Sequence, residues 1–425
     1  MSFQKAARAM RAQLYVPNRP MTNPAQQLLS EDPLQERIDG ELVECLVNPG
    51  ARVLPAGALG LHQGQTRKLE VTRRHNPTQA YRLIDGFERI EVKHDGILWG
   101  YVYLGLILPR VWTTGPAVYQ EPNEESARRV MIKKLFKPVV DMQLGLGSKE
   151  NPYKEVMRMK HFARLHRQGR RGGGFRRAEP DYGLVQDAYE NDRVLGCIDA
   201  LCDERYLYII TPFCEGGSLK QHIPVRPTAN ASAEARARNM YMQMLDNIEY
   251  LHRRGICHRD VDPSNFLVRG DGRVLLADFA MSFRYTHGFM KPMGKIGKAP
   301  YCPPEAQSPA DPFSALQCDI WGCTISLFHL FSGQPLYEKP VAKDSIFKYA
   351  IMARGLSPEY TNEEVVQAIE EAEEVDLVRL IQTSQTVLTL RPELLKLLSG
   401  VLALAPADRW TLARIRECDW MRMPL

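Results

Sequence analysis

The sequence lacks the features of secreted, membrane-spanning and repeat proteins. Its nine cysteines form no Cys-x-x-Cys pair and no metal-ligand spacing, so we expect reduced thiols in the cytoplasm and no disulfide framework. No apolar run approaches about 18 residues, which argues against a membrane helix. Residues 1–16 are basic but lack the apolar core of a signal peptide. The sequence therefore predicts a cytoplasmic protein with no membrane partner.

An excess of charge of one sign is also missing. Lys and Arg number 55 and Asp and Glu number 50, which leaves a net charge of +5 spread over the chain. Such mild basicity does not predict nucleic-acid binding, and no nucleic-acid partner is expected. Length and hydrophobic content are ample, however. With 425 residues, 44% of them hydrophobic, the chain is too long for one ordinary domain and predicts two lobes plus an extension.

The character of the sequence changes near residue 81. Residues 1–80 are rich in Pro, Gln, Arg and Gly, and they predict a loosely ordered extension. Runs rich in β-branched and aromatic residues then predict strands: "FERIEV", "GYVYLGLIL", "RRVMIKKLF" and "RYLYIITPF". Residues 151–168 predict a helix that Asn151 caps and that Pro152 begins, and the Gly- and Arg-rich residues 169–183 predict a loop.

Helical patterns dominate from Ala233 onward. They are clearest in "ARARNMYMQMLDNIEYLHRRG", "CDIWGCTISLFHLFSG" and "RPELLKLLSGVLAL". The acidic stretch 363–376 is interpreted as a solvated helix face. The order of elements predicts an α+β fold with a β-rich N-terminal lobe and a mainly helical C-terminal lobe.

Three residues with oxygen-bearing side chains follow one another in "ICHRDVDPSNFLV" and "LLADFAMSF". His258 and Arg259 precede Asp260, Asn265 lies five residues further on, and Asp278 lies eighteen residues after Asp260. This order resembles the catalytic core of the eukaryotic protein kinases, whose H-R-D-x-x-x-x-N loop and D-F-G turn perform phosphoryl transfer. Each string alone is weak evidence, but their conjunction in this order is specific.

The resemblance implies a bilobal protein-kinase-like fold over residues 81–425. Its N-lobe would span about 81–213 and its C-lobe about 214–425. It also implies ATP and Mg²⁺ as cofactors and a protein as the substrate. Nothing in the sequence indicates an oligomeric state.

The same resemblance assigns roles to the oxygen ligands. Mg²⁺ prefers hard oxygen atoms, so Asn265 and Asp278 are the implied metal ligands. Asp260 is the implied group that accepts and orients the substrate hydroxyl. Arg259, next to Asp260, is counted with the catalytic residues, and in the family it is the usual partner of an activating phosphate.

Two further residues are implied to act on the nucleotide phosphates. In "RRVMIKKL", Lys133 matches the strand lysine of the family, and Lys134 would lie on the opposite strand face. Glu155 follows 22 residues later on the expected helix, with Val156 and Met159 marking the inward side. We expect Glu155 to pair with Lys133.

"YIITPFCEGGSL" resembles the hinge between the kinase lobes. By this resemblance, Thr211 is the residue beside the adenine, and the backbone of Pro212 and Cys214 would bond the edge of the base. Proline has no N–H, but this position is expected to offer only its carbonyl group.

Three more residues match structural positions of the family. Glu305 in "CPPE" would pair with Arg409 in "PADRW", and Asp319 in "CDIWG" would support the catalytic loop. None of them is expected to touch the substrate.

The glycine-rich loop of the family, G-x-G-x-x-G-x-V, is matched only in part. Gly100 and Val102 fit, whereas Gly96 lies four residues before Gly100 instead of three, and Trp99 is bulky. Gly96, Gly100 and Val102 are the implied cofactor-binding residues here. A rival placement around Gly115 lacks the other glycines.

Two departures lie next to the metal ligands and the catalytic aspartate. Ala280 replaces the glycine of D-F-G, which removes no ligand. Asp262 stands where the family has a lysine, and Lys298 stands where serine/threonine kinases have a threonine. We predict that Asp262 and Lys298 form a compensating ion pair.

Two functions remain open at this point. The first is an active serine/threonine kinase, because Pro263 and Ser264 are typical of serine/threonine kinases. Activity is supported by five retained polar residues: Lys133, Glu155, Asp260, Asn265 and Asp278. The alternative is a pseudokinase, a scaffold that holds nucleotide but transfers phosphate poorly. The departures in the glycine-rich loop and the catalytic loop favour this alternative.

Overall fold

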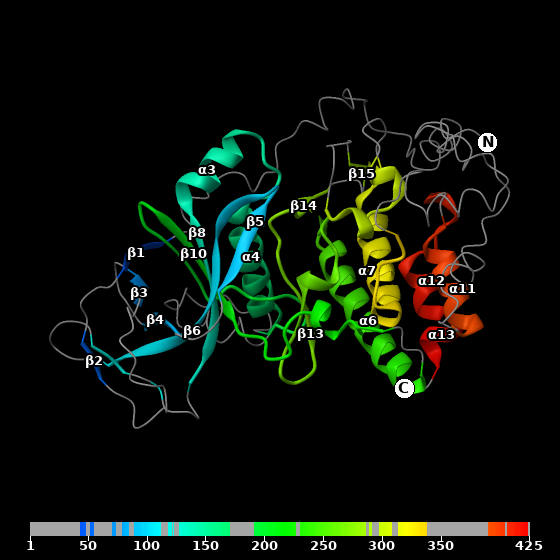
Figure 1. Cartoon of the computed structure of the whole chain (residues 1–425), viewed down its shortest axis with the longest axis horizontal. Coiled ribbons are helices and arrows are strands. Elements are labelled where there is room, and N and C mark those ends of the chain that lie inside the picture. The colour runs from blue at the N-terminus through cyan, green and yellow to red at the C-terminus, as the bar shows by residue number, and fades with distance from the viewer. Residues whose placement is uncertain are drawn as a thin grey trace. The chain divides into compact units, whose positions relative to one another are not determined.

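The computed structural model describes three short strands before residue 79 and most of the chain from residue 79 to residue 423 (Figure 1). The gaps after residue 79 are residues 85–88, 112–117, 121, 123–126, 171–190, 227–229, 286–288, 291–296, 308–312, 338–389 and 404–405. Three sequence predictions therefore lie outside the described residues: the rival glycine Gly115, the loop residues 171–183 and the acidic stretch 363–376.

The described residues form two compact units. The sheet unit comprises the described parts of Leu34–Gly216 and Arg269–Met281, and the helical unit comprises those of Gly217–Val268 and Ser282–Leu425. The first break lies close to the expected lobe boundary at residues 213 and 214. Arg269–Met281, which we expected in the C-lobe, groups with the sheet unit.

The sheet unit contains a curled, mainly antiparallel sheet. Its strand order is β2-β7-β6-β4-β3-β1-β9-β10-β8, with β5 paired to β6, and an additional pairing of β6 with β8 closes the path. The strands are β1 (Val43–Val47), β2 (Arg52–Leu54), β3 (Glu70–Arg73), β4 (Gln79–Leu83), β5 (Ile90–His94), β6 (Ile97–Val111), β7 (Val118–Gln120), β8 (Arg129–Phe136), β9 (Asp199–Cys202) and β10 (Tyr206–Pro212). The short strand β13 (Val274–Leu276) also belongs to this unit.

The expected extension contributes strands to this sheet. β1, β2 and β3 all lie within residues 1–80, for which we expected a loosely ordered extension. β1 pairs in parallel with β9, whose residues lie more than 150 positions later in the chain. Such long-range pairing gives four- and five-residue strands a partner that their own composition does not reveal.

Two helices follow β8. The expected helix is α4 (Pro152–Arg170), and the Asn151 side chain accepts hydrogen bonds from the N–H groups of Tyr153 and Lys154 at 3.0 and 3.2 Å. The sequence prediction did not include α3 (Lys137–Gly145), although Pro138 stands in its first turn.

The helical unit contains the three helices that the sequence predicted. They are α6 (Ala231–His252), α7 (Ala315–Ser332) and α11 (Pro392–Val401), followed by the short α12 (Leu412–Glu417) and α13 (Asp419–Arg422). Short strands also belong here: β11 (Ile256–Cys257), β12 (Phe266–Val268), β14 (Phe283–Arg284), β15 (Phe289–Met290) and β16 (Phe313–Ser314). Tyr241 of α6 and Thr324 of α7 share a buried hydrogen bond of 2.9 Å.

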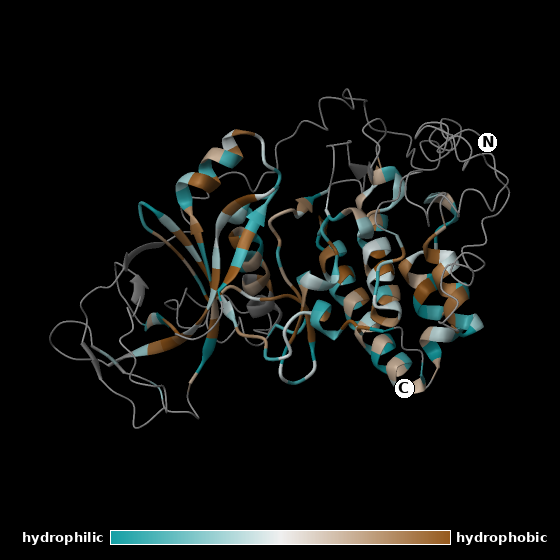
Figure 2. Cartoon of the chain, in the orientation of Figure 1, coloured by the Kyte–Doolittle hydropathy of each residue, from teal (hydrophilic) through white to brown (hydrophobic). Residues whose placement is uncertain are grey.

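The hydrophobic residues form a core within each unit. Figure 2 shows them in the strands of the sheet and on the larger helices. The sheet core includes Ile107, Ile132, Leu201, Tyr208 and Ile210, each almost completely buried. Among the helices of the described part, none is long and apolar enough to cross a membrane.

Candidate active site

A buried ion pair joins β8 to α4 in the sheet unit. The Lys133 Nζ lies 2.8 Å from the Glu155 Oε2, and the two side chains are 16% and 7% exposed. Burial opposes the charge of Lys133, but the carboxylates of Asp278 and Glu155 raise the pKa of Lys133 well above its usual value. Burial, partly offset by Lys133, raises the pKa of Glu155 to about 7. The predicted pair is therefore confirmed.

The neighbouring lysine has a different environment. Lys134 lies 3.8 Å from the centre of the Tyr206 ring, a cation–π contact, and burial lowers its pKa. Because neighbouring residues of a strand face opposite ways, only Lys133 can meet Glu155.

The two residues that follow Asp278 pack against α4, the helix that carries Glu155. The Asp278 backbone has a φ of 61°, an uncommon value for a residue with a side chain. Phe279 is buried and packs its ring 5.3 Å from that of Phe162 in α4. The Asn151 N–H, at the start of α4, donates to the Ala280 carbonyl at 3.1 Å. These contacts hold Asp278 near Lys133 and Glu155, as its effect on both pKa values indicates.

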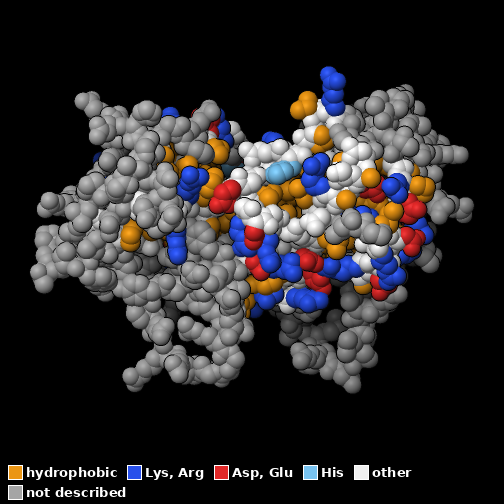
Figure 3. Space-filling view, turned by 90° about the horizontal axis from the view of Figure 1, so that it is seen from below, with side chains coloured by type: hydrophobic (Ala, Val, Ile, Leu, Met, Phe, Trp, Pro, Cys, Tyr) orange, Lys and Arg blue, Asp and Glu red, His pale blue; other side chains and the backbone are white. Residues whose placement is uncertain are grey.

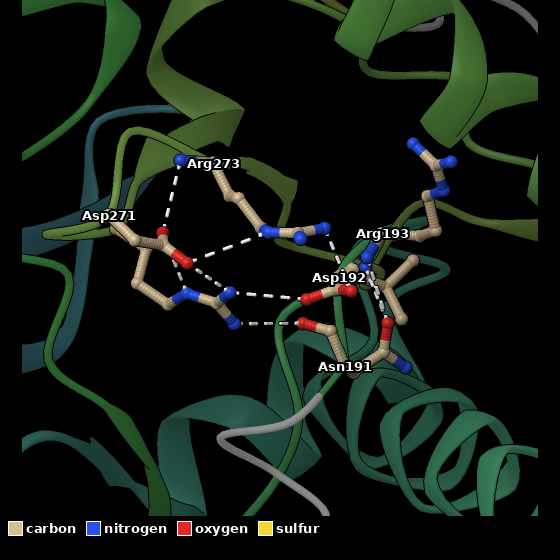
Figure 4. Close-up of polar contacts among 7 residues, drawn as sticks. Asn191, Asp192, Arg193, Asp271 and Arg273 are labelled. Carbon is tan, nitrogen blue, oxygen red and sulfur yellow. Dashed lines mark hydrogen bonds and ion pairs between the residues drawn. The ribbon is translucent and has the colours of Figure 1, made fainter. Parts of the chain in front are cut away.

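A network of surface ion pairs lies beside β13, the strand that leads to Asp278. Figure 4 shows the Arg273 side chain between Asp271 and Asp192, with contacts to both carboxylates. The Arg273 Nη1 lies 2.8 Å from the Asp192 Oδ2, and Arg269 reaches Asp192 at 3.1 Å and Asp271 at 2.5 Å. The hydrogen bond from Arg269 lowers the pKa of Asp271 to about 2.

Residues 191–194, which include Asp192, pair directly with β13. The Asn191 side chain accepts from the N–H groups of Arg193 and Val194, and the Arg193 carbonyl accepts from the Leu276 N–H at 3.0 Å. The sequence prediction missed this network, because its members are ordinary polar residues far apart in the chain. Each of its surface ion pairs contributes only about 0–1 kcal/mol to the free energy of unfolding. We therefore interpret the network as a means of orienting β13 and not as a major source of stability.

The segment that resembles the glycine-rich loop is a tight hairpin. Asp95 and Gly96 have φ values of 47° and 80° and form the two-residue turn between β5 and β6. A side chain at Gly100 would approach the Lys134 carbonyl oxygen to 2.1 Å, so the pairing of β6 with β8 requires this glycine. Val102 lies directly opposite Lys133 in that pairing.

Trp99 is buried in this hairpin. It is 1% exposed, and its ring meets His94 edge to face at 5.6 Å. The indole N–H has no hydrogen-bond acceptor among the described residues. His94 in turn lies 2.5 Å from Glu150, the residue before the cap of α4. The hairpin is therefore fixed to the start of α4.

The expected hinge follows β10. Thr211 and Pro212 are its last two residues and lie opposite Met131 and Val130 of β8. Cys214 is buried, which raises the pKa of its thiol to about 12. The expected contacts of Thr211, Pro212 and Cys214 with an adenine stay predictions.

The catalytic-loop residues Asp260 and Asn265 meet in the helical unit. The Asn265 Nδ2 donates to the Asp260 backbone carbonyl at 2.7 Å and to the Asp260 Oδ2 at 2.9 Å. The amide nitrogen is thereby used, and the amide oxygen is the atom suited to a cation. The donor set fits a metal that takes its other ligands from phosphates. Among the described residues, no group of three or more acidic, His or Cys side chains could hold a metal ion by itself.

Asp319 of α7 supports this loop, as expected. Its buried carboxylate accepts hydrogen bonds at 2.8 Å from the backbone N–H groups of His258 and Arg259. The His252 Nε2 lies 2.9 Å from the same carboxylate. The sequence analysis missed His252, which lies at the end of α6.

Asp319→Asn should therefore lower the free energy of unfolding by about 1–3 kcal/mol, because an amide cannot accept at both positions and leaves a buried N–H unsatisfied. Denaturant titration measures this loss. The exposed Asp408→Asn is the matched control and should change stability by less than about 0.5 kcal/mol. Equal losses for the two variants would contradict the supporting role of Asp319.

Arg259 is buried beside this loop. It is 8% exposed, its backbone φ is 72°, and burial lowers its pKa. Its guanidinium lies 5.8 Å from the Phe283 ring, and its Nε and Nη2 have no partner among the described residues. Tyr285 and Thr286 are the nearby residues that could carry an activating phosphate, and Thr286 lies outside the described residues.

Two predicted ion pairs occur further along the chain. Glu305 and Arg409 form a two-fold contact, with distances of 2.5 and 2.9 Å. The predicted pair of Asp262 and Lys298 is also present. Both predictions are confirmed.

Comparison with known proteins agrees with this geometry. A model of the protein kinase domain matches residues 176–421, which is more than half of the chain. The chain belongs to the protein kinase family. The match begins after Lys133 and Glu155, so the buried ion pair between them is what extends the resemblance into the sheet unit.

The chain is similar to curated kinases, two of which are named serine/threonine-protein kinases. The chain is 32% identical to the serine/threonine-protein kinase CHK1 of Saccharomyces cerevisiae over 176 residues, which is 40% of this chain and 33% of the relative. It is 26% identical to the serine/threonine-protein kinase stk11 of Xenopus laevis over 242 residues, 54% of this chain and 46% of the relative. It is 31% identical to the mouse sperm motility kinase 1 over 150 residues, which is 34% of this chain and 29% of the relative. The chain thus spans less than half the length of these relatives.

Proposed function

We propose that this protein kinase is an active, ATP-dependent serine/threonine kinase that transfers the γ-phosphate to a protein hydroxyl. The observation that carries this proposal is the buried pair of Lys133 and Glu155 beside Asp278. A buried lysine fixed by one carboxylate and facing a second suits a site that binds phosphates together with a cation.

Each residue would then have one task. Lys133, oriented by Glu155, would bind the nucleotide phosphates, while Asp278 and the amide oxygen of Asn265 would hold Mg²⁺. Mg²⁺, when bound, neutralises charge on the phosphates. Asp260, held by Asn265, would orient the attacking hydroxyl and accept its proton. Phosphoryl transfer needs little more than such positioning and charge stabilisation.

The preference for serine or threonine has separate support. Pro263 and Ser264 occupy the turn between Asp260 and Asn265, and two of the relatives reported above are named serine/threonine-protein kinases. Lys and Arg side chains lie among Asp and Glu side chains on the face in Figure 3, which does not favour a nucleic-acid substrate. A protein is therefore the proposed substrate.

A cytoplasmic location is part of the same proposal. The eight cysteines with described side chains are all free, as expected where thiols stay reduced.

The second candidate is a pseudokinase that holds nucleotide without transferring phosphate. The hairpin favours it, because Asp95 and Gly96 form a tight turn and Trp99 is buried behind them. A short turn offers few backbone N–H groups to phosphate oxygens.

Mg²⁺ and ATP together should raise the melting temperature of the protein, since a ligand that binds only the folded state stabilises it. At a nucleotide concentration about 100 times Kd the gain is about 2.7 kcal/mol. Asp278→Asn should abolish the part of the gain that depends on Mg²⁺. Thermal unfolding with and without Mg²⁺ measures both effects.

Asp408→Asn, the same change at an exposed position of the helical unit, is the control and should keep the full gain. A wild-type protein whose melting temperature does not respond to millimolar Mg²⁺ and ATP would remove the basis of both candidate functions.

A further inference from the structure

Asp262 is a buried carboxylate two residues after Asp260. Its side chain is 4% exposed, and it caps the turn Pro263–Asn265. One carboxylate oxygen accepts from the Ser264 N–H at 2.7 Å and from the Ser264 hydroxyl at 2.5 Å. A buried carboxylate also needs a cation nearby, because burial without one costs several kcal/mol.

Lys298 supplies that cation. Its Nζ contacts the second carboxylate oxygen of Asp262 and also donates to the Ser264 Oγ at 2.8 Å. The three side chains therefore form a closed network, in which each one touches the other two. About half of the Lys298 side chain stays exposed, so the network lies at the surface end of the turn.

The residue before Lys298 lies against the catalytic loop itself. Gly297 has a φ of 62°, and a side chain there would lie 2.7 Å from the Arg259 carbonyl oxygen and 3.3 Å from the Asp260 Oδ1. Only glycine accepts this conformation and this proximity easily. The backbone at residue 297 thus lies close to the residue that would orient the substrate hydroxyl.

The residues after Lys298 are anchored to α7. The Tyr301 hydroxyl and the His329 Nδ1 are 2.8 Å apart, and the Tyr337 hydroxyl donates to the Cys302 carbonyl at 3.0 Å. Trp321 of α7 donates its indole N–H to the same Tyr337 oxygen at 2.7 Å. Lys298 is therefore the link between a firmly anchored segment and the catalytic loop.

We propose that Lys298 is a positioning residue, whose ion pair with Asp262 locks residues 297–302 onto the catalytic loop and so fixes the geometry of Asp260. The lock acts through the turn Pro263–Asn265, because Asp262 begins this turn and Asn265, which holds Asp260, ends it. The catalytic part of this inference rests on the proposed kinase activity.

The sequence resemblance explains why such a lock is needed in this chain. Asp262 replaces a lysine of the catalytic loop, and Lys298 replaces a threonine of the facing segment. The positive charge has moved to the facing segment, and a negative charge stands in the place that the lysine has in the family. Between the end of β14 and Lys298, the only hydroxyl side chains are those of Tyr285 and Thr286, so the Lys298 contact supplies a link that needs no phosphate.

A double-mutant cycle with Asp262→Asn, Lys298→Met and the double variant tests the lock. Asp262→Asn keeps the oxygen that caps the turn and removes the charge, while Lys298→Met keeps most of the apolar stem. Each single variant should lower kcat about tenfold with KM for ATP changed less than about twofold, and the double variant should lose less than the product of the two. Lys298→Arg keeps the charge and should recover most of kcat.

Hydrogen exchange of the amides of residues 297–302 gives a readout that does not need activity. Lys298→Met should accelerate this exchange markedly, Lys298→Arg should leave it close to wild type, and Lys396→Met, which removes an exposed charge from α11, should have no effect. If the wild type transfers no phosphate, the proposed function fails, while the exchange data still decide the lock. Unchanged exchange in Lys298→Met, or strictly multiplicative kinetic effects, would overturn the inference.

Discussion

Asp260→Asn is expected to slow phosphate transfer by about two to four orders of magnitude while leaving the binding of Mg²⁺ and ATP nearly unchanged. An amide keeps the size of the side chain and can still accept the hydrogen bond that Asn265 now donates to Asp260 at 2.9 Å. It cannot take a proton from the substrate hydroxyl. Initial rates of transfer, together with the melting temperature in Mg²⁺ and ATP, separate these two functions.

The exposed Asp408→Asn is the control for this experiment, because it makes the same chemical change elsewhere in the helical unit. It should transfer phosphate at the wild-type rate. An Asp260→Asn protein as fast as wild type would remove Asp260 from the mechanism.

The second large effect concerns stability. Arg409→Met should lower the free energy of unfolding by about 3–5 kcal/mol, because it leaves the mostly buried Glu305 carboxylate without its cation. Arg409 makes two contacts with Glu305, donates to the Ala403 carbonyl at 2.8 Å and lies 4.4 Å from the Trp321 ring centre. Denaturant titration measures the loss.

Removing both partners of this pair should cost less than the two single losses added together. Glu305→Leu combined with Arg409→Met leaves no uncompensated charge, and buried ion pairs replaced by apolar groups often lose little stability. Arg422→Met, at an exposed position of α13, is the control. A loss below about 1 kcal/mol for Arg409→Met would mean that the pair does not support the fold as described.

The sequence predicted the ion pairs of the candidate site better than the strands and surface contacts around them. Lys133 and Glu155 could be paired because a strand and a helix, each with a clear periodic pattern, fix which way their side chains face. Asp262 and Lys298 could be paired because two substitutions of opposite charge occurred at positions that meet in the family. In each case the local pattern carried the information.

The parts that the sequence did not reveal depend on partners far away in the chain. β1 is a strand because it pairs with β3 and β9, not because of its five residues alone. Likewise, Arg269 meets Asp192 across 77 positions. The turn at Asp95 and Gly96 is different, since this dipeptide is a recognised hairpin signal that we had interpreted as part of a phosphate-binding loop.

That hairpin is also where the two candidate functions differ most. If Trp99 and the tight turn merely replace a flexible loop, Lys133 and the metal ligands can still position the phosphates, and transfer proceeds. If the hairpin obstructs the phosphates, the buried Lys133–Glu155 pair holds the fold together without supporting catalysis. Only a measurement of transfer distinguishes the two.

The most direct measurement is transfer of labelled γ-phosphate from ATP, in the presence of Mg²⁺, to a generic basic protein and to the chain itself. The account predicts labelled phosphoserine or phosphothreonine with the wild type, and at most traces with Asp260→Asn or Asp278→Asn. A wild-type protein that binds Mg²⁺ and ATP, as its melting temperature would show, but leaves both acceptors unlabelled would contradict it and identify a pseudokinase.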